Sequence, residues 1–106
     1  MRKYLFHGTY TPEGYRGLLG EGGSARIDAA RRALASAGGS LEAFYFSCDE
    51  EDFYIIVNLP DYVTATAVTL AGNASGTFSI RATELLTPEE MDTAAKKSVD
   101  FRPPGH

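Results

Sequence analysis

The sequence contains a single cysteine, Cys48, which excludes an intramolecular disulfide bond and a zinc site built from several cysteines. It has no run that approaches the roughly 18 consecutive apolar residues of a membrane-spanning helix. The first residues are basic, but His7 and Gly8 interrupt the apolar stretch before it reaches the length of a secretion signal. We therefore expect a cytoplasmic protein in a reducing compartment.

An excess of positive charge is also absent, because 10 Lys and Arg residues stand against 14 Asp and Glu residues and the formal net charge is −4. Nucleic acids and anionic membranes attract proteins that present a basic field. The composition therefore argues against both as partners.

What the chain does contain is enough apolar material for a hydrophobic core. Of its 106 residues, 43% are hydrophobic, and the aromatic residues comprise 6 Tyr and 6 Phe but no Trp. A chain of this length forms one domain. We expect this domain to span residues 1–98, with residues 99–106 as a flexible C-terminal tail.

Alternating side chains predict four β-strands, over residues 3–10, 40–48, 53–59 and 77–86. Residues 49–52 are all acidic, which suits the solvated turn of an antiparallel hairpin better than a strand. In the strand before this turn, strict alternation places Leu41, Ala43 and Tyr45 on one face and Glu42, Phe44 and Phe46 on the other.

Capping residues and apolar spacing predict the helices. A first helix starts at Thr11-Pro12-Glu13, is interrupted by the glycines of residues 14–23, and resumes after Ser24 as a second cap. The glycine-rich residues 20–24 are expected to be a flexible segment that could cover a pocket. A second helix follows Pro60-Asp61, and a short C-terminal helix runs from Thr87 to about Lys97. The expected buried stripe of the second helix is Val63, Ala67, Leu70 and Ala71.

The order strand, helix, strand, strand, helix, strand predicts an α+β, ferredoxin-like βαββαβ fold. Two helices cover one face of such a sheet and leave the other face bare. On that face the alternation places Leu5, Tyr54 and Ile56, and a monomer rarely exposes such a patch. We therefore expect a homodimer formed through the sheet faces.

From Tyr4 to about Met91 the chain resembles the GYD domain family, small bacterial proteins of the dimeric α/β-barrel kind. The resemblance lies in the order and spacing of several short segments: residues 11–14, 26–30, 38–45, 52–53, 60–61 and 78–83. It implies the ferredoxin-like fold and the dimer. It implies no particular activity, because proteins of this fold include cofactor-free oxygenases, isomerases, haem enzymes and ligand binders.

The chain departs from the family pattern at two places. Relatives carry a Gly-Tyr-Asp-like turn where this chain has residues 49–52, of which only Asp52 corresponds. Relatives also tend to carry an acidic residue before the Pro-Asp step, where this chain has Asn58. A role of the namesake turn is therefore in question here.

Two residues are candidates for chemistry on the bare sheet face. His7 could act as a proton shuttle or as a hydrogen-bonded structural histidine. Arg81 could bind a carboxylate or an enolate, or form an ion pair. The first strand is central in the predicted sheet, so these two residues would be neighbours. Candidate ligand-binding residues are Tyr54, Asn58, Tyr10 and Thr83.

Other motifs indicate no cofactor and no metal. The glycines of residues 20–24 lack the Gly-Lys-Ser/Thr of a phosphate-binding loop, and the acidic residues 49–52 lack EF-hand spacing. Acidic neighbours disfavour the thiolate of Cys48, which we interpret as inert.

Three hypotheses about function remain open. The chain could bind a small molecule between sheet and helices or between two sheets. It could be a cofactor-independent enzyme, isomerase- or oxygenase-like, that transfers a proton on a small oxyanionic or aromatic substrate, with His7 as base and Arg81 as oxyanion stabiliser. It could also be a protein interaction module. Catalysis requires His7 and Arg81 to converge within reach of one cavity, whereas a binding protein tolerates their separation.

Overall fold

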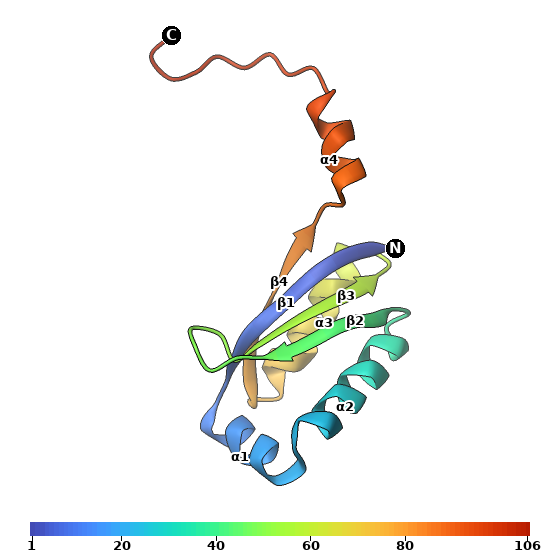
Figure 1. The fold of residues 1–106 in the computed structure, drawn as a ribbon, viewed down its shortest axis with the longest axis vertical. Helices are drawn as coiled ribbons and strands as arrows, with labels where there is room; N and C mark the ends of the chain where they lie inside the picture. Colours follow the sequence, from blue (N-terminus) through green and yellow to red (C-terminus); the bar gives the residue numbers. More distant parts are fainter.

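The computed structural model describes residues 1–106 and contains one four-stranded antiparallel sheet with helices against one face (Figure 1). The elements are β1 (Arg2–Tyr10), α1 (Pro12–Glu21), α2 (Gly23–Ser36), β2 (Ser40–Phe46), β3 (Phe53–Leu59), α3 (Tyr62–Ala74), β4 (Phe78–Leu85) and α4 (Pro88–Ala95). The strand order is β2-β3-β1-β4. This is the predicted α+β, ferredoxin-like arrangement, with β1 and β3 in the centre.

The sheet has a buried face and an open face because side chains alternate along each strand. On β1, Tyr4, Phe6 and Tyr10 are buried beneath the helices, while His7 on the other face is partly exposed. The core cluster consists of Tyr4, Phe6, Tyr10, Leu34, Phe53, Ile55, Val57, Leu59, Ala65 and Ile80. Most of these residues come from the alternating positions of β1 and β3.

The strict alternation expected in β2 is wrong, because the register shifts between Leu41 and Ala43. A bulge inserts one extra residue into a strand, so the alternation of side chains between the two faces is reversed after it. Leu41 and Phe44 consequently both pack against the core, and Ala43 pairs with Ile56 of β3. The strand also ends at Phe46 instead of Cys48.

The glycines of residues 14–23 break the helix at one position only. Gly22 has a φ of 84°, a conformation that L side chains rarely adopt, and α1 ends immediately before it. The next helix, α2, begins at Gly23 without a side-chain cap, so the predicted cap at Ser24 is wrong. Gly20 and Ser24 both lie inside helices, and the connection predicted between them is reduced to Gly22.

The buried stripe predicted for α3 is wrong in two of its four residues, since Ala67 and Ala71 do line the space above the sheet. Val63 and Leu70 are 78% and 66% exposed, whereas Ala65 is fully buried and Val68 packs against the core. This helix contains no charged residue, so it presents more than one apolar stripe, and periodicity alone does not select the side that packs. Gly72 settles the choice, because a Cβ there would lie 2.6 Å from the Phe78 ring.

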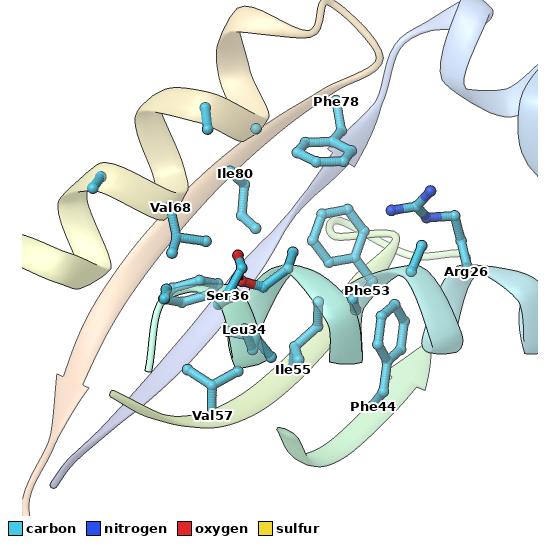
Figure 2. A pocket seen from close by; sticks show the side chains of 18 of the residues that line it. Arg26, Leu34, Ser36, Phe44, Phe53, Ile55, Val57, Val68, Phe78 and Ile80 are labelled. Atoms are coloured by element: carbon cyan, nitrogen blue, oxygen red, sulfur yellow. The ribbon is translucent and has the colours of Figure 1, made fainter. Parts of the chain in front are cut away.

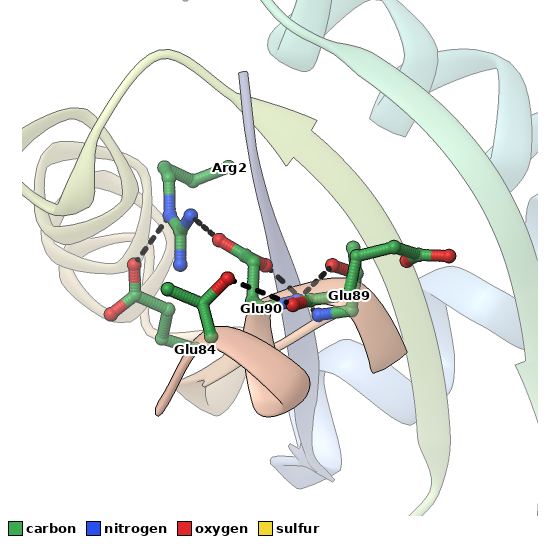
Figure 3. Close-up of polar contacts among 6 residues, drawn as sticks. Arg2, Glu84, Glu89 and Glu90 are labelled. Carbon is green, nitrogen blue, oxygen red and sulfur yellow. Dashed lines mark hydrogen bonds and ion pairs between the residues drawn. The ribbon is translucent and has the colours of Figure 1, made fainter. Parts of the chain in front are cut away.

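The C-terminal helix α4 projects beyond the end of the sheet, and the chain after it continues outward (Figure 1). The molecule therefore measures 57 Å along its longest axis. Thr87 and Glu90 form a capping box at the start of α4. The Arg2 guanidinium joins this helix to the sheet, because it contacts Glu90 and lies 3.0 Å from Oε1 of Glu84 (Figure 3). The helix ends at Ala95, two residues before the predicted end.

Candidate functional site

His7 and Arg81 are brought together on the open face of the sheet. The two residues are direct partners in the pairing of β1 with β4, and Tyr54 of β3 is the partner of His7 on the other side. These three side chains form a row across the sheet, which Tyr45 of β2 continues. His7 and Arg81 are therefore neighbours on the open face, but neither residue lines the cavities of about 460 Å³ and 240 Å³ that the structure contains.

Glu51 completes this cluster from the loop between β2 and β3. Its Oε1 lies 3.0 Å from Nδ1 of His7 and 2.8 Å from Nη2 of Arg81. The hydrogen bond from His7, followed by that from Arg81, lowers the pKa of the Glu51 carboxyl, and burial opposes them. An ionised Glu51 accepts a hydrogen bond from Nδ1 of His7, and the other ring nitrogen, Nε2, lies 3.3 Å from the Thr83 hydroxyl.

The other predicted binding residues divide between this cluster and distant places. Tyr54 and Thr83 belong to it, because one pairs with His7 and the other contacts its ring. Asn58 does not, since it pairs with Lys3, four residues along β1 from His7, and accepts a hydrogen bond from the Lys3 Nζ at 3.1 Å. Four residues of a strand span about 13 Å. Tyr10 lies on the opposite face, in the core.

The acidic residues 49–52 combine three different environments. Asp49 and Glu50 are exposed, as expected for a solvated turn, but Glu51 turns to the open face and Asp52 is buried on the other side. The Asp52 Oδ2 accepts hydrogen bonds from the Tyr10 backbone N–H at 2.9 Å and from the Tyr15 hydroxyl at 2.5 Å. The aspartate of the namesake turn therefore ties the hairpin to the end of β1 and to α1.

A cavity of about 460 Å³ lies between the buried face of the sheet and the helices α2 and α3 (Figure 2). Its origin is the size of the facing helix residues, because alanines are too small to fill the space above the sheet. The alanines that line it are Ala29, Ala30, Ala33 and Ala37 of α2 and Ala67 and Ala71 of α3. Its volume falls within the range of small-molecule sites.

The cavity is strongly apolar, since 16 of its 19 lining residues are hydrophobic. Five of these are aromatic and come from four strands: Phe6, Tyr10, Phe44, Phe53 and Phe78. The polar exceptions are Arg26 and Ser36, and the Ser36 hydroxyl donates to the Ala33 carbonyl at 2.6 Å. Sequence reasoning offered the space between sheet and helices as one possible binding place, but of its candidate binding residues only Tyr10 lines this cavity. The recurring alanines of α2 are the signal that could have revealed the lining.

A smaller hollow of about 240 Å³ adjoins the cavity at Tyr10, which lines both. It contains Cys48 and Asp52 among its lining residues. Cys48 is exposed, and its thiol is free. No group of three or more His, Cys, Asp or Glu side chains is placed to hold a metal ion.

These features define a ferredoxin-like α+β domain with a polar cluster on its open sheet face and an apolar cavity beneath its helices. The family model described as the GYD domain matches residues 4–95. The chain therefore belongs to the GYD domain family. No curated protein and no solved structure matches it. None of its helices combines the length and apolarity needed to cross a membrane.

Proposed function

We propose that this protein is a homodimer that binds an apolar small molecule in the cavity between its sheet and its helices. The observation that carries the proposal is the cavity of about 460 Å³ with its almost entirely hydrophobic lining. A cavity of this kind offers poor hydrogen bonding to water, so an apolar ligand gains free energy when it displaces water or fills empty space.

The aromatic lining favours a ligand with a ring. Phe53 packs against Tyr10 with ring centroids 5.2 Å apart and against Phe78 at 5.9 Å, both tilted or edge-on. Edges and faces of these rings are thus presented to the cavity, and aromatic ligands pack well against both.

The homodimer is proposed from the open face of the sheet. Leu5 pairs with Ile56 on one side and with Thr83 on the other, and Ala43 follows Ile56. This row is apolar over three strands. Tyr45 and Tyr54 beside it are 71% and 39% exposed in the single chain. A second copy that packs its own open face here would remove this patch from water.

The test of the cavity is to fill it from within. Ala30→Phe adds a ring on α2 inside the cavity, and Ala35→Phe adds the same ring on the exposed side of the same helix. Isothermal titration calorimetry with naphthamide measures binding to both variants, and circular dichroism verifies their folding. We expect the first substitution to abolish binding and the second to leave the Kd within a factor of about two.

Either of two results would contradict this proposal. One is that the unsubstituted protein binds no naphthamide. The other is that Ala30→Phe binds it as tightly as Ala35→Phe does.

The geometry of the open face favours a second candidate, a cofactor-independent proton-transfer enzyme. His7 would act as the base through Nε2, because Glu51 holds Nδ1 and fixes the tautomer. Arg81 would stabilise a developing oxyanion. The Arg81 side chain is 73% exposed, and its guanidinium binds Glu51 through Nη2, which leaves its other N–H groups available.

Proton exchange tests this candidate without knowledge of the physiological substrate. Phenylpyruvate carries both an aromatic ring and an oxyanion-forming carbonyl, and NMR in deuterium oxide follows the loss of its α-protons. The enzyme hypothesis predicts exchange faster than in buffer and its loss in His7→Gln. Exchange that persists in His7→Gln, or that never exceeds the buffer rate, argues against it.

A further inference from the structure

Arg26 is the only charged residue among those that line the cavity. It lies in the first turns of α2, and its side chain is 30% exposed. Figure 2 shows its guanidinium directed from α2 toward the end of the cavity where Phe53 and Phe78 lie. A cation at the rim of an apolar cavity is well placed to meet one polar end of a ligand whose remainder is buried.

The pairing of Arg26 within the chain is weak. Its Nη1 lies 3.4 Å from Oε1 of Glu21, and the side chain of Glu21 is 44% exposed. An exposed pair at this distance contributes little. The guanidinium has five N–H donors in a planar fork, and its contacts with Glu21 and with the Tyr10 hydroxyl leave several of them free.

Tyr10 provides a second donor at the same end. Burial raises the pKa of the Tyr10 hydroxyl, and the nearby Arg26 guanidinium acts in the opposite direction. The hydroxyl is therefore neutral at neutral pH and carries its hydrogen. The nearby carboxylate of Asp52 is already hydrogen-bonded to the Tyr10 backbone N–H and to Tyr15.

We propose that the ligand of the cavity is an apolar carboxylic acid, whose carboxylate binds the guanidinium of Arg26 at the rim while its ring or chain is buried between sheet and helices. This inference rests on the proposed binding function and adds the chemical class of the ligand. A planar carboxylate matches the guanidinium fork, and the lining away from Arg26 offers only apolar side chains and an internally bonded Ser36.

The experiment compares naphthoic acid with naphthamide, which has the same shape but no charge, by isothermal titration calorimetry on the full chain at neutral pH. We expect the acid to bind about tenfold more tightly than the amide, which corresponds to about 1.4 kcal/mol. In Arg26→Gln the affinity for the acid should fall about tenfold, and the affinity for the amide should stay constant.

Two further variants separate recognition from a general effect of charge or folding. Arg31→Gln removes a more exposed arginine of the same helix, outside the cavity lining, and should change neither affinity. Glu21→Gln removes the competing carboxylate and should strengthen binding of the acid about twofold to threefold.

The outcomes distinguish the two proposals. If the amide and the acid bind equally, or Arg26→Gln weakens both to the same extent, the inference about the carboxylate is overturned while binding in the cavity stands. If neither compound binds, for example because a segment of a second copy fills the cavity, both proposals are overturned.

Discussion

At the scale of single residues, Asp52 joins three segments through one carboxylate. It is 9% exposed and accepts hydrogen bonds from the backbone of β1 and from a tyrosine of α1. Hydrogen bonds to a charged acceptor are stronger than neutral ones, and an N–H left without a partner in the interior is costly. This accounts physically for an aspartate at this position in a turn whose other residues differ from the family pattern.

We predict that Asp52→Ala lowers the free energy of unfolding by about 2 to 3 kcal/mol. The Tyr10 N–H and the Tyr15 hydroxyl both lose their acceptor in this variant. Asp49→Ala, an exposed acid in the same loop, should change stability by less than about 0.5 kcal/mol. Urea denaturation measures both, and equal effects of the two substitutions would argue against the structural role.

The lowered pKa of Glu51 predicts a specific dependence of stability on pH. Its pKa is lower in the folded chain than in the unfolded chain, where a glutamate titrates at about 4.3. The unfolded state therefore binds a proton first as the pH falls. The stabilisation by Glu51 is complete above this value and is lost as the pH falls through the lower, folded-state pKa.

We therefore expect the free energy of unfolding to fall less in Glu51→Gln than in the unsubstituted protein when the pH is lowered from neutral to below the range in which glutamates titrate. Glu50→Gln, an exposed neighbour, should keep the original dependence. Urea denaturation at a series of pH values measures the difference. Parallel curves for all three proteins would show that the contact with His7 does not contribute.

Strand alternation and the central place of β1 suffice to predict that His7 and Arg81 are neighbours across two paired strands. The same alternation places Tyr10 with Tyr4 and Phe6, on the face opposite His7, so its location in the core is also readable from the sequence. Glu51 is different. It lies in a loop, where no periodicity relates position to direction, and its approach to His7 depends on how the chain turns between β2 and β3.

At the scale of elements, α1 forms despite three glycines because Thr11 caps it and because one glycine is required for packing. The Thr11 hydroxyl accepts a hydrogen bond from the Gly14 N–H at 3.2 Å. Gly14 itself is buried, and a Cβ at this position would lie 1.8 Å from the carbonyl oxygen of Thr77. Gly17, one turn later, has open space around it.

This contrast predicts opposite effects of the same substitution within one helix. Gly14→Ala forces α1 away from the segment before β4 and should destabilise the protein by about 1–3 kcal/mol. Gly17→Ala replaces a flexible residue in an exposed helical position and should stabilise it by about 0.5–1 kcal/mol. Thermal and urea denaturation check both signs. Two effects of the same sign would contradict the packing described here.

The packing of α2 and α3 could be predicted only in part. Leu34 of α2 falls on the buried side, as its spacing indicates, but the uncharged α3 offers several sides, and the one that packs is chosen by contact with Phe78. The cavity arises from the distance at which these two helices lie above the sheet. That distance depends on which side chains meet, so it is a tertiary property that local spacing does not encode.

At the scale of the whole molecule, the two faces of the sheet contribute different structural features. The buried face supplies the core and the floor of the cavity. The open face carries an apolar row that includes Leu5 and Ile56, beside the polar cluster of His7, Glu51 and Arg81. If a second copy packs on this row, each cluster is withdrawn from water, which strengthens the interactions of its charges with one another and with a ligand.

We predict that the protein sediments at twice its chain mass of 11.4 kDa. Ile56→Glu places a charge in the middle of the open face and should produce monomers, because a buried carboxylate without a partner opposes association. Val63→Glu introduces the same charge on the outer side of α3, where Val63 is 78% exposed, and should leave the dimer intact. Sedimentation equilibrium at several concentrations measures the mass of each protein, and circular dichroism verifies its folding. A folded Ile56→Glu variant with the mass of the unsubstituted protein would place the contact between copies, if there is one, away from the open face of the sheet.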